Sequence, residues 1–250
     1  MDDVDGVDGV DGVDNGGVAD VARPPIVAVG ATAAAEALAA GAIIAVPAVG
    51  GYCLAVRAGS PEAEAQLVDL AADPEGPHYA VGSTEALRSL TSGWTGEVAR
   101  LLERCWPGPL EVFLPQAAAA GGAEGADAAA EPAGDPGAAP SGGWAVVVGM
   151  PDGRALRRLC RDQGPWRTVP LSFTEAQQVA LAFDAAAVAL VVDGGRREGP
   201  PPTLVDATVS PIRVLRQGAL PGSFIEGTML MSTRRRFSRR RRGRDEGGSA

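Results

Sequence analysis

Short apolar segments alternate with helix-forming segments from about residue 26 to residue 216, and this alternation limits the possible folds more than any other feature. Uninterrupted apolar runs of four to eight residues are typical of buried strands. Such runs occur at 42–46, 144–148 and 188–192, and 110–114 is apolar except for Glu111, so a strand is expected there too. Because strands alternate with helices in chains whose sheet is covered by helices, the sequence predicts an α/β fold.

Helix signals occupy the stretches between these strands. Ser60 is a suitable N-cap, Pro61 fits the first helical position, and Glu62 adds an acid to the first turn. We expect helices over 31–40, 61–72, 84–90, 95–105, 152–161 and 174–183, and short final strands at 204–206 and 212–215. The irregular spacing and the closely paired last strands favour a twisted, mixed open sheet over a Rossmann sheet.

Charge and composition divide the chain into segments. The first 20 residues hold seven Asp and no Arg, whereas the last 17 hold eight Arg. We predict a disordered acidic tail over 1–22, one domain over 23–230, and a disordered arginine-rich tail over 231–250. Residues 116–143, rich in Ala, Gly, Pro, Asp and Glu, are predicted to be a low-complexity insert within that domain.

The arginine-rich tail is the strongest cationic feature of a chain whose net charge is −9. We predict that it binds a polyanion, either RNA or an anionic membrane surface, or that it folds back on the acidic tail. The predicted polyanion-binding residues are Arg234, Arg235, Arg236, Arg239, Arg240, Arg241 and Arg242. The acidic body itself disfavours broad, sequence-independent binding of nucleic acid.

Several common site types are not expected. Cys53, Cys105 and Cys160 form no C-x-x-C pair, so we predict reduced thiols and no metal site. No apolar run is long enough for a membrane span, and the acidic start does not fit a signal peptide. We therefore expect a cytoplasmic protein. The chain contains no lysine and hence no Walker lysine.

Five segments, in the same order, carry a resemblance to a known family. Residues 47–54 (PAVGGYCL) resemble the signature Pro-Thr-Asp-Thr-Val-Tyr-Gly-Leu of the YrdC family of threonylcarbamoyl-adenylate synthases. Residues 106–110 (WPGPL) are similar to its Trp-Pro-Gly-Pro-Leu. The remaining matches are 146–152 (VVVGMPD), 192–195 (VDGG) with 203–206 (TLVD), and 214–220 (VLRQGAL).

The resemblance implies a twisted open α/β sheet with flanking helices and a concave groove. It implies synthesis of threonylcarbamoyl-adenylate and pyrophosphate from L-threonine, bicarbonate and ATP with Mg²⁺, for a modification of certain tRNAs. Carried over by position, Arg216 would bind the nucleotide. The substrate pocket would include Pro47, Tyr52, Leu54 and Thr203.

The sequence also departs from the family pattern at several positions. Ala48, Val49 and Gly50 replace the Thr, Asp and Thr that would contact threonine. The Lys-x-Arg that follows the second helix falls at 71–73, where Asp73 reverses the charge, and the strand arginine is replaced by Gly149. A triphosphate needs cations, so these losses weaken the predicted phosphate site.

Two hypotheses follow. The first is a diverged, active synthase that uses ATP and Mg²⁺. The second, which we favour, is a catalytically inactive YrdC-like protein that binds a nucleotide, double-stranded RNA or a protein partner. His78, the only histidine, is interpreted as a loop residue, since the sequence shows no partner that would position it as a base. Asp193-Gly194-Gly195 is interpreted as a turn and not as a Mg²⁺ site.

Overall fold

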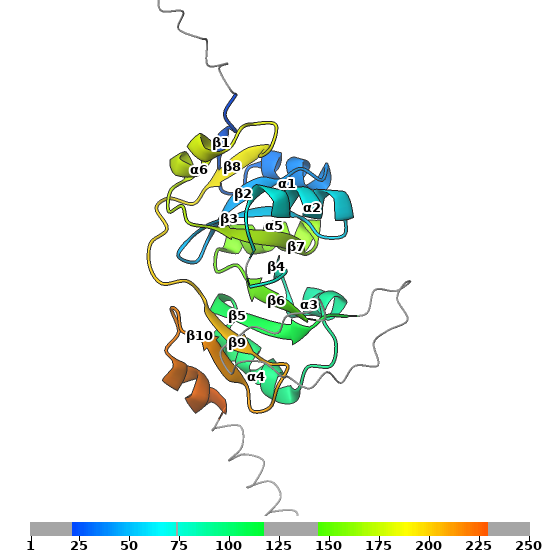
Figure 1. Cartoon of the computed structure of the whole chain (residues 1–250), viewed down its shortest axis with the longest axis vertical. Coiled ribbons are helices and arrows are strands. Elements are labelled where there is room, and N and C mark those ends of the chain that lie inside the picture. The colour runs from blue at the N-terminus through cyan, green and yellow to red at the C-terminus, as the bar shows by residue number, and fades with distance from the viewer. Residues whose placement is uncertain (1–21, 74, 118–144, 230–250) are drawn as a thin grey trace, which may run out of the picture.

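The computed structural model describes residues 22–73, 75–117 and 145–229. Ten strands form one mixed sheet in the order β1-β8-β2-β3-β7-β4-β6-β5-β9-β10. The strands are β1 (Ile26–Ala28), β2 (Ile44–Ala48), β3 (Gly51–Arg57), β4 (His78–Ala80), β5 (Gly108–Pro115), β6 (Ala145–Met150), β7 (Trp166–Leu171), β8 (Leu190–Asp193), β9 (Thr203–Asp206) and β10 (Arg213–Arg216). Figure 1 shows the sheet twisting along the long axis of the molecule. The predicted mixed, open α/β sheet is confirmed.

Six named helices flank the sheet, and a further helical stretch covers 222–229. The named helices are α1 (Thr32–Ala39), α2 (Pro61–Leu70), α3 (Thr84–Leu90), α4 (Gly96–Cys105), α5 (Arg154–Gln163) and α6 (Ala176–Ala182). Local signals explain where several begin. The side chains of Ser60, Ser83 and Thr95 each accept a hydrogen bond from a backbone N–H in the first turn of α2, α3 and α4.

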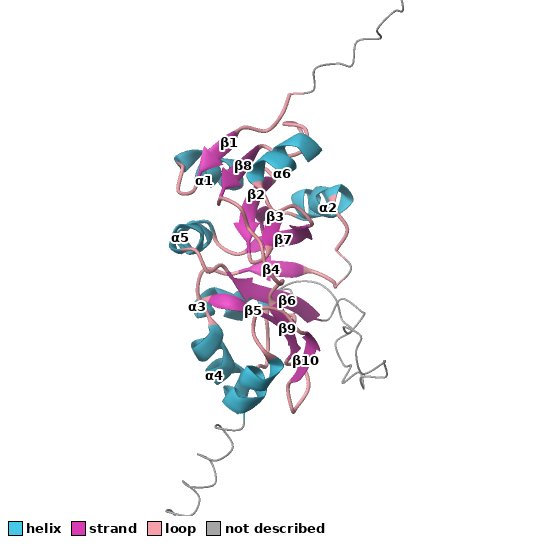
Figure 2. Ribbon diagram, turned by 90° about the vertical axis from the view of Figure 1, so that its left-hand side faces the viewer, coloured by secondary structure: helices cyan, strands magenta, loops and turns pink. Residues whose placement is uncertain are grey.

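The helices cover the two halves of the sheet differently (Figure 2). Around β2, β3 and β8, one face packs against α2 and α6, and the other packs against α1 and α5. Around β5, β6 and β9, the helices α3 and α4 cover one face. The opposite face there carries a small cluster of Phe113, Ala145, Val147 and Leu204. Along β6, alternate residues join these two clusters, as the pleat of a strand requires.

Some predicted segments cannot be compared with the structure. The acidic tail, the low-complexity insert and the arginine cluster fall almost entirely on residues 1–21, 118–144 and 230–250, outside the described part of the chain. Their boundaries and the polyanion-binding role of the tail arginines therefore stay predictions. Among the described residues, no helix is both long enough and apolar enough to cross a membrane.

Candidate functional site

A cavity of about 210 Å³ lies where the β2–β3 hairpin meets the middle of the sheet. The hairpin contributes residues 46–53, and strands β4, β5 and β6 contribute the opposite side. Strand β7, Pro201 and Pro202 on the connection from β8 to β9, and Arg216 at the end of β10 also line it. Segments far apart in the sequence thus converge on one hollow, as small-molecule sites require.

One side of the cavity is built from small side chains, and we call residues 47–51 the hairpin wall. Its turn is formed by Val49 and Gly50, since Ala48 pairs with Gly51 in the antiparallel ladder. Gly50 has a φ of 76°, and a Cβ there would lie 3.1 Å from the carbonyl oxygens of Gly199 and Pro200. The hairpin wall therefore offers a ligand backbone groups and apolar surface, without a side-chain hydroxyl or carboxylate.

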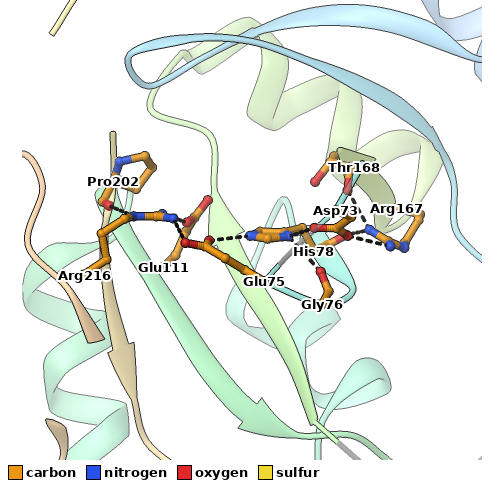
Figure 3. Close-up of polar contacts among 9 residues, drawn as sticks. All are labelled: Asp73, Glu75, Gly76, His78, Glu111, Arg167, Thr168, Pro202 and Arg216. Atoms are coloured by element: carbon orange, nitrogen blue, oxygen red, sulfur yellow. Dashed lines mark hydrogen bonds and ion pairs between the residues drawn. The ribbon is translucent and has the colours of Figure 1, made fainter. Parts of the chain in front are cut away.

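The other side, the charged wall, consists of Glu75, His78, Glu111 and Arg216. Arg216 donates from one terminal nitrogen to Glu75 Oε1 and from the other to Glu111 Oε2, the latter at 2.7 Å (Figure 3). Its Nε donates to the carbonyl oxygen of Pro202 at 3.3 Å. All three nitrogens of the predicted nucleotide-binding cation are thus already hydrogen-bonded within the protein.

His78 lies on β4 with only 4% of its surface exposed, so the interpretation of a loop histidine without partners is wrong. Its Nδ1 lies 2.7 Å from Asp73 Oδ1 and 2.9 Å from the carbonyl oxygen of Gly76. Its Nε2 lies 3.3 Å from Glu75 Oε2. Both ring nitrogens therefore face carboxylates.

Two further charged residues, Asp73 and Arg167, contact the charged wall through His78. The side chain of Asp73 is 3% exposed, and its Oδ2 accepts a hydrogen bond of 2.7 Å from Arg167 on β7. Arg167 also donates to the carbonyl oxygens of His78 and Thr168, at 3.0 and 2.6 Å. Sequence reasoning placed Asp73 against a phosphate and missed Arg167. The structure instead joins the two in a buried ion pair.

The pKa values reflect this continuous network. Burial alone would lower the pKa of His78, but its hydrogen bonds to Asp73 and Glu75 and the nearby charge of Glu111 raise it to about 9. The hydrogen bond from His78, together with Arg216, lowers the pKa of Glu75 to about 2. Burial raises the pKa of Glu111 despite the opposing charges of His78 and Arg216. With His78 protonated, three carboxylates face three cations.

The residues predicted for the substrate pocket separate into two groups. Pro47 and Tyr52 line the cavity, although the Tyr52 hydroxyl is occupied: it donates to the carbonyl oxygen of Gly195 at 2.9 Å and accepts from the N–H of Gly194 at 3.0 Å. Leu54 is fully buried in the core beneath α2 and α6 and does not line the cavity. Its assignment to the pocket is corrected to a packing role.

Thr203 is also absent from the cavity lining, and the prediction that it belongs to the pocket is corrected for a similar reason. Its hydroxyl donates to the carbonyl oxygen of Leu220 at 2.7 Å and accepts from the N–H groups of Gly218 and Leu220 at 3.0 and 2.9 Å. With every hydrogen-bonding position of the hydroxyl used, Thr203 fastens the segment after β10 to β9.

One combination of groups within the cavity suits a metal ion, although the sequence predicted none. In the described part of the chain, ligand atoms of Glu75, His78 and Glu111 all lie within 4.8 Å of one another. The sequence did hold a partial signal, because Asp73 and Glu75 precede His78 by five and three residues. Glu111 and Arg216 join them only through the fold.

Solved structures with a similar fold include two of Sua5 from P. abyssi. One, of a double variant, superposes with a TM-score of 0.66 at 25% identity and covers 81% of this chain and 62% of that one. The other, of Sua5 complexed with L-threonine, has a TM-score of 0.63 at 26% identity and covers 78% and 56%. The chain thus spans about three-fifths of the length of Sua5.

E. coli YciO has a TM-score of 0.64 at 15% identity, covering 80% of this chain and 97% of YciO, which is evidence for the fold alone. No curated protein sequence matches significantly. The sequence pattern of the Sua5/YciO/YrdC family, described as telomere recombination, matches residues 36–218. This match over most of the chain and the superpositions on Sua5 lead to one conclusion: the chain belongs to the Sua5/YciO/YrdC family and has a fold like that of the threonylcarbamoyl-adenylate synthases.

Proposed function

We propose that this protein binds a small molecule in the cavity and has lost the ATP-dependent synthesis of threonylcarbamoyl-adenylate. The observation that carries the proposal is the pairing of Arg216 with both Glu75 and Glu111 inside the cavity. A triphosphate placed against this wall would compete with two carboxylates for one guanidinium. Like charges about 4 Å apart cost roughly 1–4 kcal/mol, depending on the effective dielectric constant.

The hairpin wall supports the same proposal. Adenylyl transfer relies on groups that position the substrates and stabilise developing charge. The family signature supplies hydroxyls and a carboxylate at positions that are Ala48, Val49 and Gly50 in this chain. These three residues line the cavity and can contribute only backbone groups and apolar contacts.

The cavity suits a compact ligand with little negative charge, because its volume is about 210 Å³ and two carboxylates line the charged wall. Trp166 also lines the cavity, but its indole N–H is buried and has no hydrogen-bond partner among the described residues, so it offers no donor to a ligand there.

Pyrophosphate release from ATP tests the proposal, measured on the purified full chain with and without L-threonine and bicarbonate. A Sua5 protein assayed in parallel verifies the reagents, and circular dichroism verifies that this protein is folded. We expect no release above the blank. Release that requires both substrates and falls in Arg216→Ala would overturn the proposal.

The second candidate is a diverged synthase that remains active. It is favoured by the similarity to Sua5, whose structure with L-threonine shows that a related fold holds this amino acid. Arg216 also lies in the cavity, where the resemblance placed a nucleotide-binding cation. Under this candidate, ATP with Mg²⁺ would displace Glu75 and Glu111 from Arg216, and the same assay would detect turnover.

A further inference from the structure

The charged wall contains a histidine and two carboxylates, which is a donor set used by divalent transition metals. Ligand atoms of Glu75, His78 and Glu111 lie within 4.8 Å of one another. Metal–nitrogen and metal–oxygen bonds of about 2.1 Å separate neighbouring ligand atoms by about 3.4 Å in a tetrahedral site. His78 Nε2 and Glu75 Oε2 are 3.3 Å apart, close to that spacing already.

The outer contacts of His78 match those of a metal-bound histidine. Such a histidine usually donates its second ring N–H to a carboxylate, which fixes the ring and its tautomer. Here Nδ1 faces Asp73 Oδ1 at 2.7 Å, and Asp73 is held in turn by Arg167. Figure 3 shows the imidazole between Asp73 and Glu75, with Nε2 directed toward Glu75. The ring is thereby oriented to offer Nε2 to an ion.

Arg216 leaves one oxygen of each carboxylate available. It contacts Oε1 of Glu75 and Oε2 of Glu111. Glu75 Oε2 is the atom that faces His78, and Glu111 Oε1 accepts no hydrogen bond from any described side chain or backbone group. Arg216 can therefore stay in place and orient both carboxylates while Glu75 Oε2 and one oxygen of Glu111 bind an ion.

Charge and access also permit an ion. Three carboxylates, those of Asp73, Glu75 and Glu111, face the two guanidinium groups of Arg167 and Arg216, so the wall holds one more acidic group than permanent cations. The three ligand residues line the cavity, so the ion's remaining coordination positions would face it.

We propose that Glu75, His78 and Glu111 bind one divalent transition-metal ion of the zinc or manganese type, with open coordination positions directed into the cavity. Three protein ligands with an open position are the arrangement of metal sites that bind or activate a small molecule. The ligand of the cavity would then be a compact oxygen donor that coordinates the ion. The metal site does not depend on the loss of synthase activity.

Binding of ZnCl₂ and CoCl₂ to the chelator-treated full chain tests the site. Titration calorimetry measures affinity and stoichiometry, and the visible absorption of Co²⁺ reports whether a nitrogen ligand is present. We expect one ion per chain. Because loss of an outer partner alone typically weakens metal binding by about 10–100-fold, loss of a direct ligand in His78→Gln or Glu111→Gln should weaken it by at least that factor.

Glu85→Gln is the matched control, because its carboxylate on α3 is 88% exposed and the residue does not line the cavity. Glu85→Gln should bind Zn²⁺ and Co²⁺ with the affinity of the wild type. Because His78 is buried, His78→Gln is the variant at risk of losing stability. Glu111, whose side chain is 21% exposed, is less so, and Glu111→Gln therefore tests the loss of a ligand independently. Thermal melting identifies any variant that is not folded.

Two results would overturn the metal site. One is the absence of a bound ion in folded wild-type protein. The other is unchanged affinity and an unchanged Co²⁺ spectrum in folded Glu111→Gln and His78→Gln, which would place the ion elsewhere. Because no ATP is present, these outcomes are independent of the pyrophosphate assay, and either proposal can fail while the other stands.

Discussion

The hairpin wall and the charged wall face the same cavity but differ in the groups that they offer a ligand. The hairpin wall has lost side chains, since Ala48, Val49 and Gly50 stand where the family has hydroxyls and a carboxylate. The charged wall is crowded with functional groups, yet its protein groups bind one another. The proposed loss of synthase activity would thus have two causes: functional groups absent from the hairpin wall, and an arginine of the charged wall already paired with carboxylates of the protein.

The largest effect is expected where the charged wall is anchored. Arg167→Ala removes the guanidinium from Asp73, whose side chain is 3% exposed. Breaking a buried ion pair leaves an uncompensated charge and typically costs about 3–5 kcal/mol. We expect a loss of this size in the free energy of unfolding, measured with urea.

Arg158→Ala is the control for this experiment, since its pair with Asp162 is 83% and 58% exposed and should contribute less than about 1 kcal/mol. A fall in the free energy of unfolding of Arg167→Ala no larger than that of this control would mean that His78 alone stabilises the buried carboxylate of Asp73. The charged wall would then not depend on the buried ion pair.

The hairpin wall should resist restoration of the family signature. Gly50→Thr places a β-branched residue at a φ of 76°, and left-handed backbone costs such residues about 1–2 kcal/mol. Its Cβ would also lie 3.1 Å from two carbonyl oxygens. Gly59→Thr is the control. Gly59 has a φ of 99° and an added Cβ would have no atom within 4 Å, so this variant measures the cost of the left-handed backbone without a steric clash.

We therefore expect Gly50→Thr to unfold at lower denaturant than Gly59→Thr, and both at lower denaturant than the wild type. Equal stability of Gly50→Thr and the wild type would show that the turn can hold the family's hydroxyl. The small residues of the hairpin wall would then not be fixed by packing.

Freeing Arg216 should convert the charged wall toward an anion site. In Glu75→Gln/Glu111→Gln, both carboxylates that hold the guanidinium become neutral amides. We expect inorganic pyrophosphate, titrated in the presence of a chelator, to bind at least about tenfold more tightly, which is ~1.4 kcal/mol. Adding Arg216→Ala should abolish the gain, and Glu85→Gln should show none. Unchanged affinity in the double variant would mean that the carboxylates do not restrain Arg216.

The smallest effect is expected at Tyr52, the aromatic residue that the hairpin shares with the family signature. Tyr52→Phe removes the contacts of the hydroxyl with Gly194 and Gly195 and should lower the free energy of unfolding by about 0.5–1.5 kcal/mol. Tyr79→Phe removes only one hydrogen bond, of 3.2 Å to Glu64, so its free energy of unfolding should fall by less. Unchanged stability of Tyr52→Phe would point to a role in ligand binding instead of packing.

Much of the fold could be predicted because its signals are local. The predicted cap Ser60 marks a helix that the structure confirms, and the helix expected from Thr95 is confirmed too, with Thr95 as its cap. Strands β1, β3, β4 and β7 were not predicted. Strands β1 and β4 have only three residues each, and β7 carries Arg167 and Thr168 inside the core. Those buried polar residues do not fit an apolar strand pattern until their partners are known.

The site was predicted less well because its contacts are distant in sequence. Arg216 meets Glu111 across 105 residues and Glu75 across 141. Position within a family motif therefore identified Arg216 without showing what it contacts. His78 was misread for a different reason: its partners Asp73 and Glu75 are only five and three residues away, but its burial follows from the pairing of β4 with β6 and β7.

Binding of ATP to the wild-type protein tests the central claim most directly, since the claim is that Arg216 is already neutralised by the cavity's own carboxylates. Calorimetric titration with ATP and Mg²⁺ should show a Kd weaker than about 1 mM, that is, less than ~4 kcal/mol of binding free energy. Micromolar binding that disappears in Arg216→Ala would contradict the account and would restore this cavity as a nucleotide site.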